Sequence, residues 1–258
     1  MSKVFKNSLL SLLTFTSLIF FSLQVSAQVD EEIEKIFPIT SKTNFSLKNI
    51  NGAVTINSWP ESNIKVLVNI SAKSEVSRDD LIINMSQDGQ NVRVSSEYKE
   101  DSYNQNKQGA KVDYQVWLPA DSNLSEIELI NGNLIIRDIN GEIEAQVVNG
   151  SIKASGISGN SRISSVNGSV DVLYSVNANT VNNIDIETVN GSIKLYLPKH
   201  INAAITADTM HGSINTEFGL EAKKNSFFGR NLRGKIGSGD SLINLDSVNG
   251  SIKVLKSE

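Results

Sequence analysis

The sequence from Ile130 to Val170 reads INGNLIIRDINGEIEAQVVNGSIKASGISGNSRISSVNGSV. Within it an Asn-Gly or Ser-Gly pair recurs every nine residues, with its first member at positions 131, 140, 149, 158 and 167. Further copies begin at positions 51, 190 and 249, and a degenerate copy has His211 in the Asn position. Self-similarity at a fixed short period is typical of repeat proteins. The stretch therefore predicts a repeating structure over most of the chain.

Each copy carries the same pattern of apolar residues. An aliphatic residue precedes the Asn, another follows it by three positions, and a further apolar residue lies two beyond, as in Val148, Ile152 and Ala154. The residues between them are polar or charged, such as Lys153. Alternation with a period of two indicates strands with one buried and one wet face. We expect short strands joined at Asn-Gly corners, with Ile152 in the core and Lys153 at the surface.

Two all-β architectures fit this pattern. Asn-Gly favours a tight hairpin turn with positive φ, which would give an antiparallel meander. The alternative is a single-stranded parallel β-solenoid (β-helix-like), in which each coil buries its aliphatic face against its neighbours and like residues stack. A hairpin gives no reason for residue identities to repeat, so the solenoid is favoured. Alternate corners would then stack in this order: Asn131, Asn149, Asn167, Asn190, His211, Asn249.

The chain divides into three parts. Residues 1–27 have the form of a secretory signal, because Lys3 and Lys6 precede an uncharged apolar run and Val25-Ser26-Ala27 follows it. A retained membrane anchor is the alternative, but the run is shorter than the roughly 20 residues that span a bilayer. Residues 28–118 form an irregular N-terminal β region continuous with the array, and residues 119–258 form the regular repeats. We expect the mature protein to begin at Gln28, and loops at 99–109 and 223–235.

These residues resemble a known family. Tyr114-Gln115-Val116-Trp117-Leu118-Pro119, the repeated Val-Asn-Gly-Ser-Ile-Lys, and the closing segment from Gly237 to Ile252 are similar to the adhesin-like domain of exported bacterial proteins (DUF4097-like). The resemblance covers most of residues 40–256. It implies a β-helix-like fold, and adhesion is inferred in the family from that shape. It supplies no catalytic residues.

Composition excludes several classes of function. The chain has a net charge of −4, and loss of Lys3 and Lys6 with the signal makes it more acidic, so it is not suited to binding nucleic acid phosphates. It contains no cysteine, which excludes a lipid-anchored lipoprotein and disulfides. Only His200 and His211 could be nitrogen ligands, and we expect no metal and no cofactor. The turn at 237–240 is glycine-rich, but it is isolated and favours a tight bend over a phosphate site.

A polysaccharide lyase or hydrolase is the enzymatic alternative, because β-helices often carry such activities. It would need converging carboxylates. Outward positions offer six: Asp138, Glu142, Glu144, Asp171, Asp185 and Glu187. Alternating acidic and basic residues on a wet strand face usually only aid solubility, and few aromatic residues lie on the expected outer faces; Tyr174 and Tyr196 are exceptions. We therefore expect no catalytic site.

The 223–235 segment is basic and carries exposed aromatic residues. It contains Lys223, Lys224, Phe227, Phe228, Arg230, Arg233 and Lys235. These residues would form a solvated loop, meet an anionic envelope polymer, or cap the end of the solenoid.

The sequence thus predicts a non-catalytic, exported cell-envelope protein for adhesion or surface binding, in the periplasm, at the cell surface or outside the cell. Its partner would be a surface glycan or an envelope protein. The alternative is a structural element that associates with itself through the solenoid ends. No transmembrane segment is expected after signal cleavage.

Overall fold

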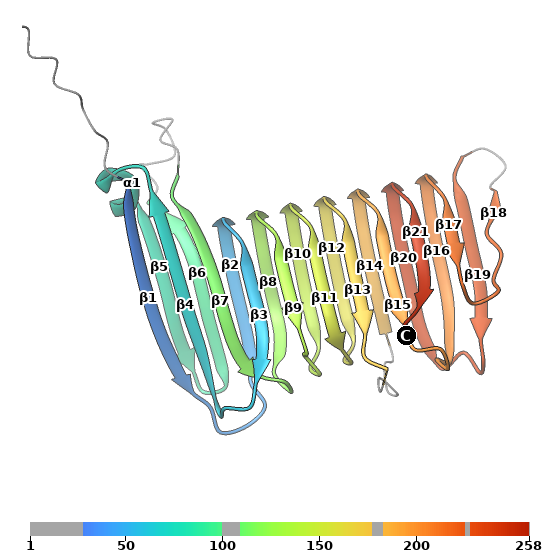
Figure 1. Cartoon of the computed structure of the whole chain (residues 1–258), viewed down its shortest axis with the longest axis horizontal. Helices are drawn as coiled ribbons and strands as arrows, with labels where there is room; N and C mark the ends of the chain where they lie inside the picture. The colour runs from blue at the N-terminus through green and yellow to red at the C-terminus, as the bar shows by residue number, and fades with distance from the viewer. Residues whose placement is uncertain (1–27, 100–108, 177–182, 225–227, 258) are drawn as a thin grey trace, which may run out of the picture.

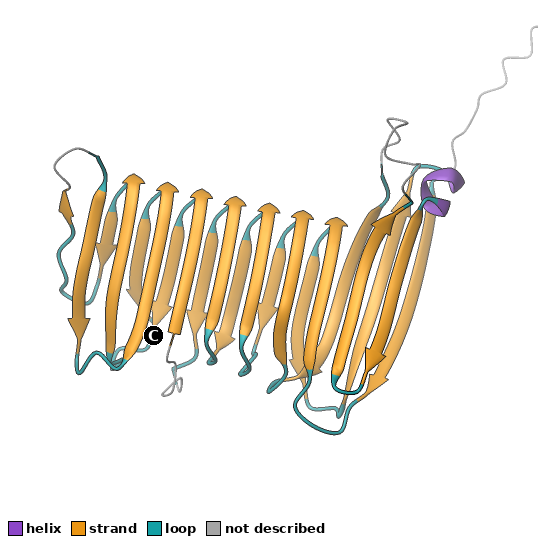
Figure 2. Cartoon of the chain, turned by 180° about the vertical axis from the view of Figure 1, so that it is seen from behind, coloured by secondary structure: helices purple, strands orange, loops and turns teal. Residues whose placement is uncertain are grey.

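The computed structural model describes residues 28–99, 109–176, 183–224 and 228–257. The expected signal and its cleavage site lie outside these residues, as does most of the 99–109 loop. The described chain forms two long sheets that face each other along their whole length (Figures 1 and 2). A short helix, α1 (Glu75–Asp79), lies at the N-terminal end. None of the described residues belongs to a helix with the length and hydrophobicity needed to cross a membrane.

The two sheets are named here A and B. Sheet A contains, in spatial order, β1 (Val29–Pro38), β4 (Asn63–Ala72), β7 (Lys111–Pro119), β3 (Val54–Trp59), β9 (Leu134–Arg137), β11 (Ile152–Ile157), β13 (Val170–Tyr174), β15 (Ile193–Leu197), β21 (Ile252–Lys256) and β17 (Ile214–Thr216). Sheet B contains β18 (Lys223–Lys224), β19 (Arg230–Ile236), β16 (Ala203–His211), β20 (Ser241–Asn249), β14 (Asn183–Asn190), β12 (Ser161–Asn167), β10 (Ile143–Asn149), β8 (Asn123–Asn131), β2 (Asn44–Asn51), β6 (Asn91–Tyr98) and β5 (Leu81–Asp88).

Each coil of the array contributes one strand to each sheet. β10 in sheet B is followed by a bend at Gly150, and the chain continues as β11 in sheet A. β10 pairs in parallel with β8 and β12, which places Asn149 in register with Asn131 and Asn167. The strands that flank Asn149-Gly150 therefore lie in different sheets. The all-β, solenoid-like architecture is as expected, and the antiparallel meander is wrong.

The stack is not purely parallel, and in this the expectation of a single-stranded parallel solenoid is wrong. β1, β4 and β7 pair antiparallel at the N-terminal end, as do β5 and β6. At the C-terminal end β19 pairs antiparallel with β16 and with β18. The 223–235 segment is thus largely part of sheet B and not simply a loop. Both ends of the stack therefore contain antiparallel strand pairs, whereas the strands of its repeating middle are parallel.

The coils do not stack in the order of the sequence. β20 lies between β14 and β16, and β21 lies between β15 and β17. Asn249 therefore lies between Asn190 and His211, so the expected order of the last two corners is wrong. The 38-residue gap between positions 211 and 249 accommodates β18 and β19, after which the chain returns to the interior of the stack.

The core lies between the sheets and is filled by the alternate residues of every strand. Ile152 is 1% exposed and Lys153 is exposed, which confirms their expected facing. The aliphatic residue before the Asn at the end of a sheet B strand does not face the core, contrary to expectation, whereas Ile139 before Asn140 is buried. In β10 the inward residue is Val147, and Val148 points to the outer face and is partly exposed. Strand alternation continues up to the bend, so the inward position is the second before Asn.

The glycines at the bends are required mainly by close packing between coils. A Cβ on Gly168 would lie 2.0 Å from the carbonyl oxygen of Gly150, and one on Gly250 would lie 1.7 Å from that of Gly191. Neither glycine has a φ in the left-handed range. Gly52, Gly132 and Gly150 do have a positive φ, of 128°, 154° and 158°, so a positive φ is used at some corners only, whereas the close approach of the next coil is common to all of them. Glycine stacks on glycine because no side chain fits.

Two ladders of side-chain hydrogen bonds join the coils at these bends. On the outside, the Nδ2 of each Asn donates to the Oδ1 of the Asn in the neighbouring coil, over 2.8–2.9 Å, through residues 131, 149, 167, 190 and 249. Inside, a hydroxyl two positions before the Asn donates to the glycine carbonyl of the neighbouring coil. Its members are Ser165 to Gly150, Thr188 to Gly168, Ser247 to Gly191 and Thr209 to Gly250. The hydroxyl bonds provide partners for the glycine carbonyl groups, which lie at the bends and outside the hydrogen-bonded ladders of the sheets.

Candidate functional site

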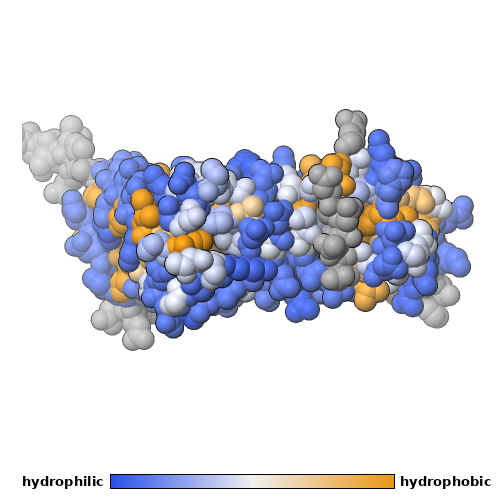
Figure 3. Space-filling model, turned by 90° about the horizontal axis from the view of Figure 1, so that it is seen from below, coloured by the Kyte–Doolittle hydropathy of each residue, from blue (hydrophilic) through white to orange (hydrophobic). Residues whose placement is uncertain are grey.

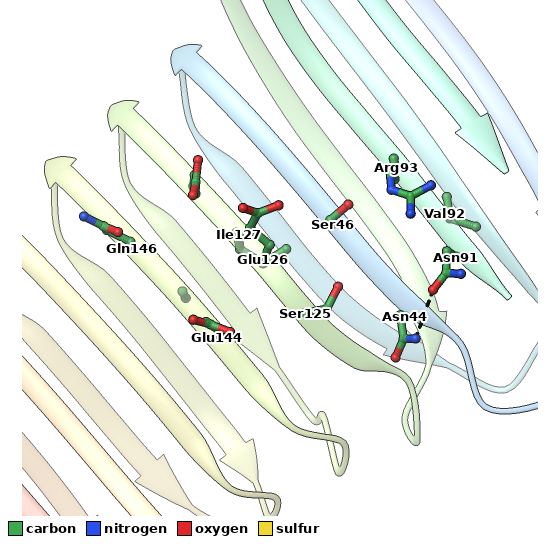
Figure 4. Close-up of a pocket in the computed structure, with 12 residues that line it drawn as sticks. Asn44, Ser46, Asn91, Val92, Arg93, Ser125, Glu126, Ile127, Glu144 and Gln146 are labelled. Carbon is green, nitrogen blue, oxygen red and sulfur yellow. Dashed lines mark hydrogen bonds between the residues drawn. The ribbon is translucent and has the colours of Figure 1, made fainter. Parts of the chain in front are cut away.

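The outer face of sheet B carries three grooves along its length. The first, of about 320 Å³, lies over β2, β6, β8 and β10 (Figure 4). The second, of about 520 Å³, follows the N-terminal halves of β8, β10, β12 and β14. The third, of about 490 Å³, follows the C-terminal ends of β12, β14, β20 and β16. Because strands repeat side by side, each outward position becomes a row of side chains that runs along the stack.

The first groove is polar and its charges are paired. Lys48 Nζ lies 2.8 Å from a carboxylate oxygen of Glu126 and 3.2 Å from one of Glu128. This lysine holds the pKa of Glu126 below its usual value. At the start of the strands Asn44 donates to Asn91 (Figure 4). Asn44 also accepts from Asn123. A carboxylate bound to a lysine is poorly suited to donate or accept a catalytic proton.

The second groove brings together three of the six carboxylates considered as catalytic candidates. Glu142, Glu144 and Asp185 line it. Asp185 lies 3.6 Å from Arg162 of the adjacent strand. Glu144, Arg162 and Asp185 are in register on β10, β12 and β14, so a basic residue lies between these two carboxylates.

The other three candidates lie elsewhere. Glu187 lines the third groove. Asp171 belongs to sheet A, where Lys194 lies 3.5 Å from it. Asp138 follows β9 with a φ of 57° and is placed by the turn there. The structure therefore divides the six candidates among two sheets and a turn.

The third groove combines an apolar row with an acidic row. We define the apolar stripe as the outward residues before the Asn position in four adjacent strands, which are Val166, Val189, Val248 and Met210. We define the acidic row as Glu187, Asp246 and Asp208, which are in register on β14, β20 and β16. Partial desolvation on the strand face raises the pKa of Asp246, and the charges of Asp208, Glu187 and Asp185 raise it further. Like charges are thus concentrated here.

The two histidines and the glycine-rich turn lie at the surface. His200 and His211 are exposed, and His211 continues the Asn row next to Asn249. Within the described residues, no group of three or more His, Cys, Asp or Glu side chains is arranged to hold a metal ion. Ser238 of the 237–240 turn bonds the Asp240 carboxylate and an Asn202 oxygen.

The basic segment lies in sheet B, and Tyr174 and Tyr196 lie in sheet A. Lys223, Lys224, Arg230, Arg233 and Lys235 are exposed on β18 and β19, at the C-terminal end of sheet B. Phe228 is 73% exposed and borders the third groove, whereas Phe227 lies outside the described residues. Tyr174 is buried and hydrogen-bonded to Ser161, and Tyr196 lies on the outer face of sheet A.

A pair of tryptophans on the outer face of sheet A was not predicted from the sequence. The rings of Trp59 and Trp117 lie 6.4 Å apart and are inclined by 34°. Lys65 Nζ lies 5.6 Å from the Trp117 ring and 2.7 Å from Glu34. These are the only two tryptophans of the chain. The alternation Val116-Trp117-Leu118 was the available signal, because it places Trp117 opposite two core residues.

The lower edge of the molecule differs from the outer face of sheet B in the distribution of its hydrophobic residues. Figure 3 shows this edge, where hydrophobic residues gather in separate patches among hydrophilic ones. The apolar stripe, by contrast, is a continuous row over adjacent strands.

Comparison with known proteins identifies similar sequences and folds. The family described as Toastrack DUF4097 matches residues 121–255, just over half of the chain. A structure named as a candidate cell adhesion protein of Clostridium sporogenes is similar over 89% of this chain and 100% of its own, with 19% identity and a TM-score of 0.55. A candidate adhesin of Bacteroides fragilis shares 11% identity over 88% of this chain and 97% of its own, with a TM-score of 0.39. No curated protein matches the chain.

Proposed function

Because the chain belongs to the Toastrack DUF4097 family, we propose that it is an exported, non-catalytic β-solenoid protein of the bacterial cell envelope that acts in adhesion or surface binding. In this proposal residues 1–27 direct export and are removed after Ala27. The stacked Asn-Gly corners keep the coils in register and so hold the two outer faces flat and repetitive.

The observation that carries the proposal is the outer face of sheet B. Grooves of about 320, 520 and 490 Å³ follow one another along this face, over eight neighbouring strands from β6 to β16. A long groove lined by rows of similar side chains is suited to holding an extended partner through many weak contacts. The name of the Clostridium structure also fits a binding role.

The first test is binding of the mature chain, residues 28–258, to envelope fractions of the producing cells and to a glycan array. Retention on either surface at micromolar concentration would support the proposal. The outer-face triple variant Glu144→Gln/Gln146→Ala/Arg162→Ala should reduce retention, and Lys153→Ala on sheet A serves as the control. Absence of retention on both surfaces would contradict surface binding.

Export can be tested separately. Mass spectrometry of the protein taken from the envelope or the medium should find an N-terminus at Gln28. A chain that keeps Met1 in the exported pool would contradict the proposed cleavage.

The tryptophans offer a direct readout of sheet A. Stacking of a sugar ring on Trp59 or Trp117 would change their fluorescence, and no other tryptophan contributes. A glycan that binds the protein and leaves this fluorescence unchanged occupies another face. Trp59→Phe and Trp117→Phe would show which ring responds.

Self-association through the two ends is a second candidate function, because the ends carry opposite charges. The edge strand β1 exposes Asp30, Glu32 and Glu34, and the hairpin β18–β19 exposes five basic side chains. Unpaired edge strands are ready sites for pairing with another chain. Sedimentation at several concentrations and salt levels tests this. A monomer at all concentrations and low salt would exclude it.

A further inference from the structure

The apolar stripe is exposed although the core lies directly beneath it. Val189 is 40% exposed, Val248 37% and Met210 54%, and Val166 is partly exposed. Phe228, at 73% exposed, extends the apolar surface at one side. Single exposed aliphatic residues are ordinary, but four in register on adjacent strands form a continuous patch that marks an interaction site.

The acidic row lies beside the stripe, two residues earlier on each strand. Among the described residues, no lysine or arginine lies within ion-pairing distance of Glu187, Asp246 or Asp208. Elsewhere on the same face acidic residues have basic partners, because Lys48 binds both Glu126 and Glu128 and Arg162 lies near Asp185. Three adjacent carboxylates without a cation repel one another, and a cationic partner would relieve that repulsion.

We propose that the third groove binds a basic amphipathic helix of a partner protein, with the apolar face of the helix on Val166, Val189, Val248 and Met210 and its basic side chains on Glu187, Asp246 and Asp208. This inference rests on the proposed function of surface binding and names its partner class. Charge complementarity selects the partner, because the groove offers apolar surface and unneutralised acid together.

The spacing of the coils favours a helix over an extended segment. Adjacent strands in a sheet lie about 4.8 Å apart, so the stripe presents a side chain at about that interval along the stack. A helix that lies along the stack repeats its apolar ridge about every 5.4 Å. An extended peptide repeats one face about every 6.6 Å and would fall out of step within two or three coils. Long lysine and arginine side chains can reach the acidic row from the flank of such a helix.

The experiment measures the affinity of the mature chain for a fluorescein-labelled 18-residue peptide of Leu and Lys with helical spacing. The comparison peptides are a scrambled one of the same composition and an 18-residue oligolysine. We expect the helical peptide to bind at least about tenfold more tightly than either, and its binding to weaken as salt rises. Equal binding of the scrambled peptide or of oligolysine would overturn the proposal.

Two variants and a matched control locate the site. Val189→Ser/Val248→Ser and Glu187→Gln/Asp246→Asn/Asp208→Asn should each weaken binding by about tenfold or more, since each removes one of the two recognition elements. The control is Leu173→Ser on sheet A, because Leu173 is 39% exposed and so nearly matches Val189. An effect of Leu173→Ser equal to that of the stripe variants would overturn the assignment to this groove, as would unchanged binding in both groove variants.

Two other occupants are outcomes of the same set of measurements. A dimer of the protein alone that the Val189→Ser/Val248→Ser variant dissolves would make the stripe a contact between copies and overturn the proposal. Binding to phosphatidylcholine vesicles that this variant abolishes would make it a lipid surface, with the same result. Binding to envelopes without binding to the helical peptide would leave the proposed function in place and refute only the helix. Binding to the peptide without binding to envelopes or glycans would refute the proposed function and support the helix.

Discussion

At the scale of single residues, position within the repeat decides whether a side chain supports the core. Ile152 is 1% exposed, whereas its neighbour Lys153 is exposed on the outer face of sheet A. We expect Ile152→Ala to lower the free energy of unfolding by about 2–5 kcal/mol, through lost burial and the cavity left behind. Lys153→Ala should change it by no more than about 0.5 kcal/mol. Denaturant midpoints measure both, and equal effects would contradict the facing of β11.

The glycine stack gives a second prediction at this scale. Gly168→Ala would place a Cβ 2.0 Å from the Gly150 carbonyl oxygen, so adjacent coils would have to separate. We expect a loss of about 3 kcal/mol or more, in the range that marks severe backbone conflict. Gly89→Ala is the control, because Gly89 has a φ of 56° and a Cβ there would meet no heavy atom within 4 Å. Its cost should be about 1 kcal/mol from conformation alone. A smaller loss at Gly168 than at Gly89 would refute the packing explanation.

The acidic row gives a prediction about pH. The raised pKa of Asp246 means that its ionisation destabilises the folded chain, so this destabilisation is absent below the unfolded pKa of about 3.8 and develops as pH rises through the folded pKa. Asp246→Asn should therefore have a higher Tm than the parent at pH 7, and the difference should vanish below about pH 3.8.

Glu126 is the matched control with the opposite sign. Lys48 lowers its pKa, so its charge stabilises the fold above about pH 4.5 and this contribution is lost as pH falls through the folded pKa. Glu126→Gln should lower the Tm at pH 7 and have little effect in acid. A lower Tm for Asp246→Asn at neutral pH would show that the carboxylates of the acidic row do not repel one another.

At the scale of strands and bends, the sequence predicts the repeating elements well and their edges poorly. Recurrence of Val-Asn-Gly-Ser-Ile-Lys indicates one bend and one strand each time, and the structure has both. The pattern predicted Val148 to face the core, because the alternation was counted back from Ile152 across the bend. The chain changes from sheet B to sheet A at that bend, so the alternation does not continue through it. β18 and β19 were missed because they lie outside the repeat, where β19 pairs antiparallel with β16 and β18 pairs antiparallel with β19.

The candidate site was less predictable than the fold. The hydroxyl two positions before the Asn was visible in Ser165, Thr188 and Ser247, yet its bond to a glycine carbonyl depends on which coil lies next to it. The acidic row depends on the same information, because Asp246 lies between Glu187 and Asp208 only when β20 is inserted between β14 and β16. Spacing along the chain does not contain that order.

The hydroxyl ladder is an element that can be tested by itself. Thr188 Oγ1 donates to the carbonyl of Gly168 over 3.2 Å and is buried. Thr188→Val keeps the shape but removes this donor, and we expect the free energy of unfolding to fall by about 1–3 kcal/mol because the partly buried carbonyl of Gly168 loses its partner. β10 has Val147 at the equivalent position, so an aliphatic side chain fits there. Ser164→Ala on the outer face is the control and should be nearly neutral in the same denaturation experiment.

At the scale of the whole molecule, the stack is stabilised coil by coil through contacts between neighbours. Most coils have neighbours that are also close in sequence, so the middle of the array can form progressively. The first coil, β2–β3, already lies beside the later strands β8 and β9, and the last coil, β20–β21, joins β14–β15 to β16–β17 from between them. Assembly of the C-terminal end therefore has to wait for the final residues of the chain.

This order gives the prediction that concerns the molecule as a whole. Removal of residues 241–258 deletes β20 and β21 and leaves β16 without the strand that links it to β14. We expect hydrogen exchange to become fast in β16 and β19, while β8, β10 and β12 keep their protection, because each repeat depends only on its neighbours. Removal of residues 28–38, which form the edge strand β1 and the residue before it, is the control and should expose only β4. If β16 stays protected in the shortened chain, it has moved one place to pair with β14. That outcome would show that the corners can stack in the order of the sequence, and that insertion of β20–β21 imposes the native order.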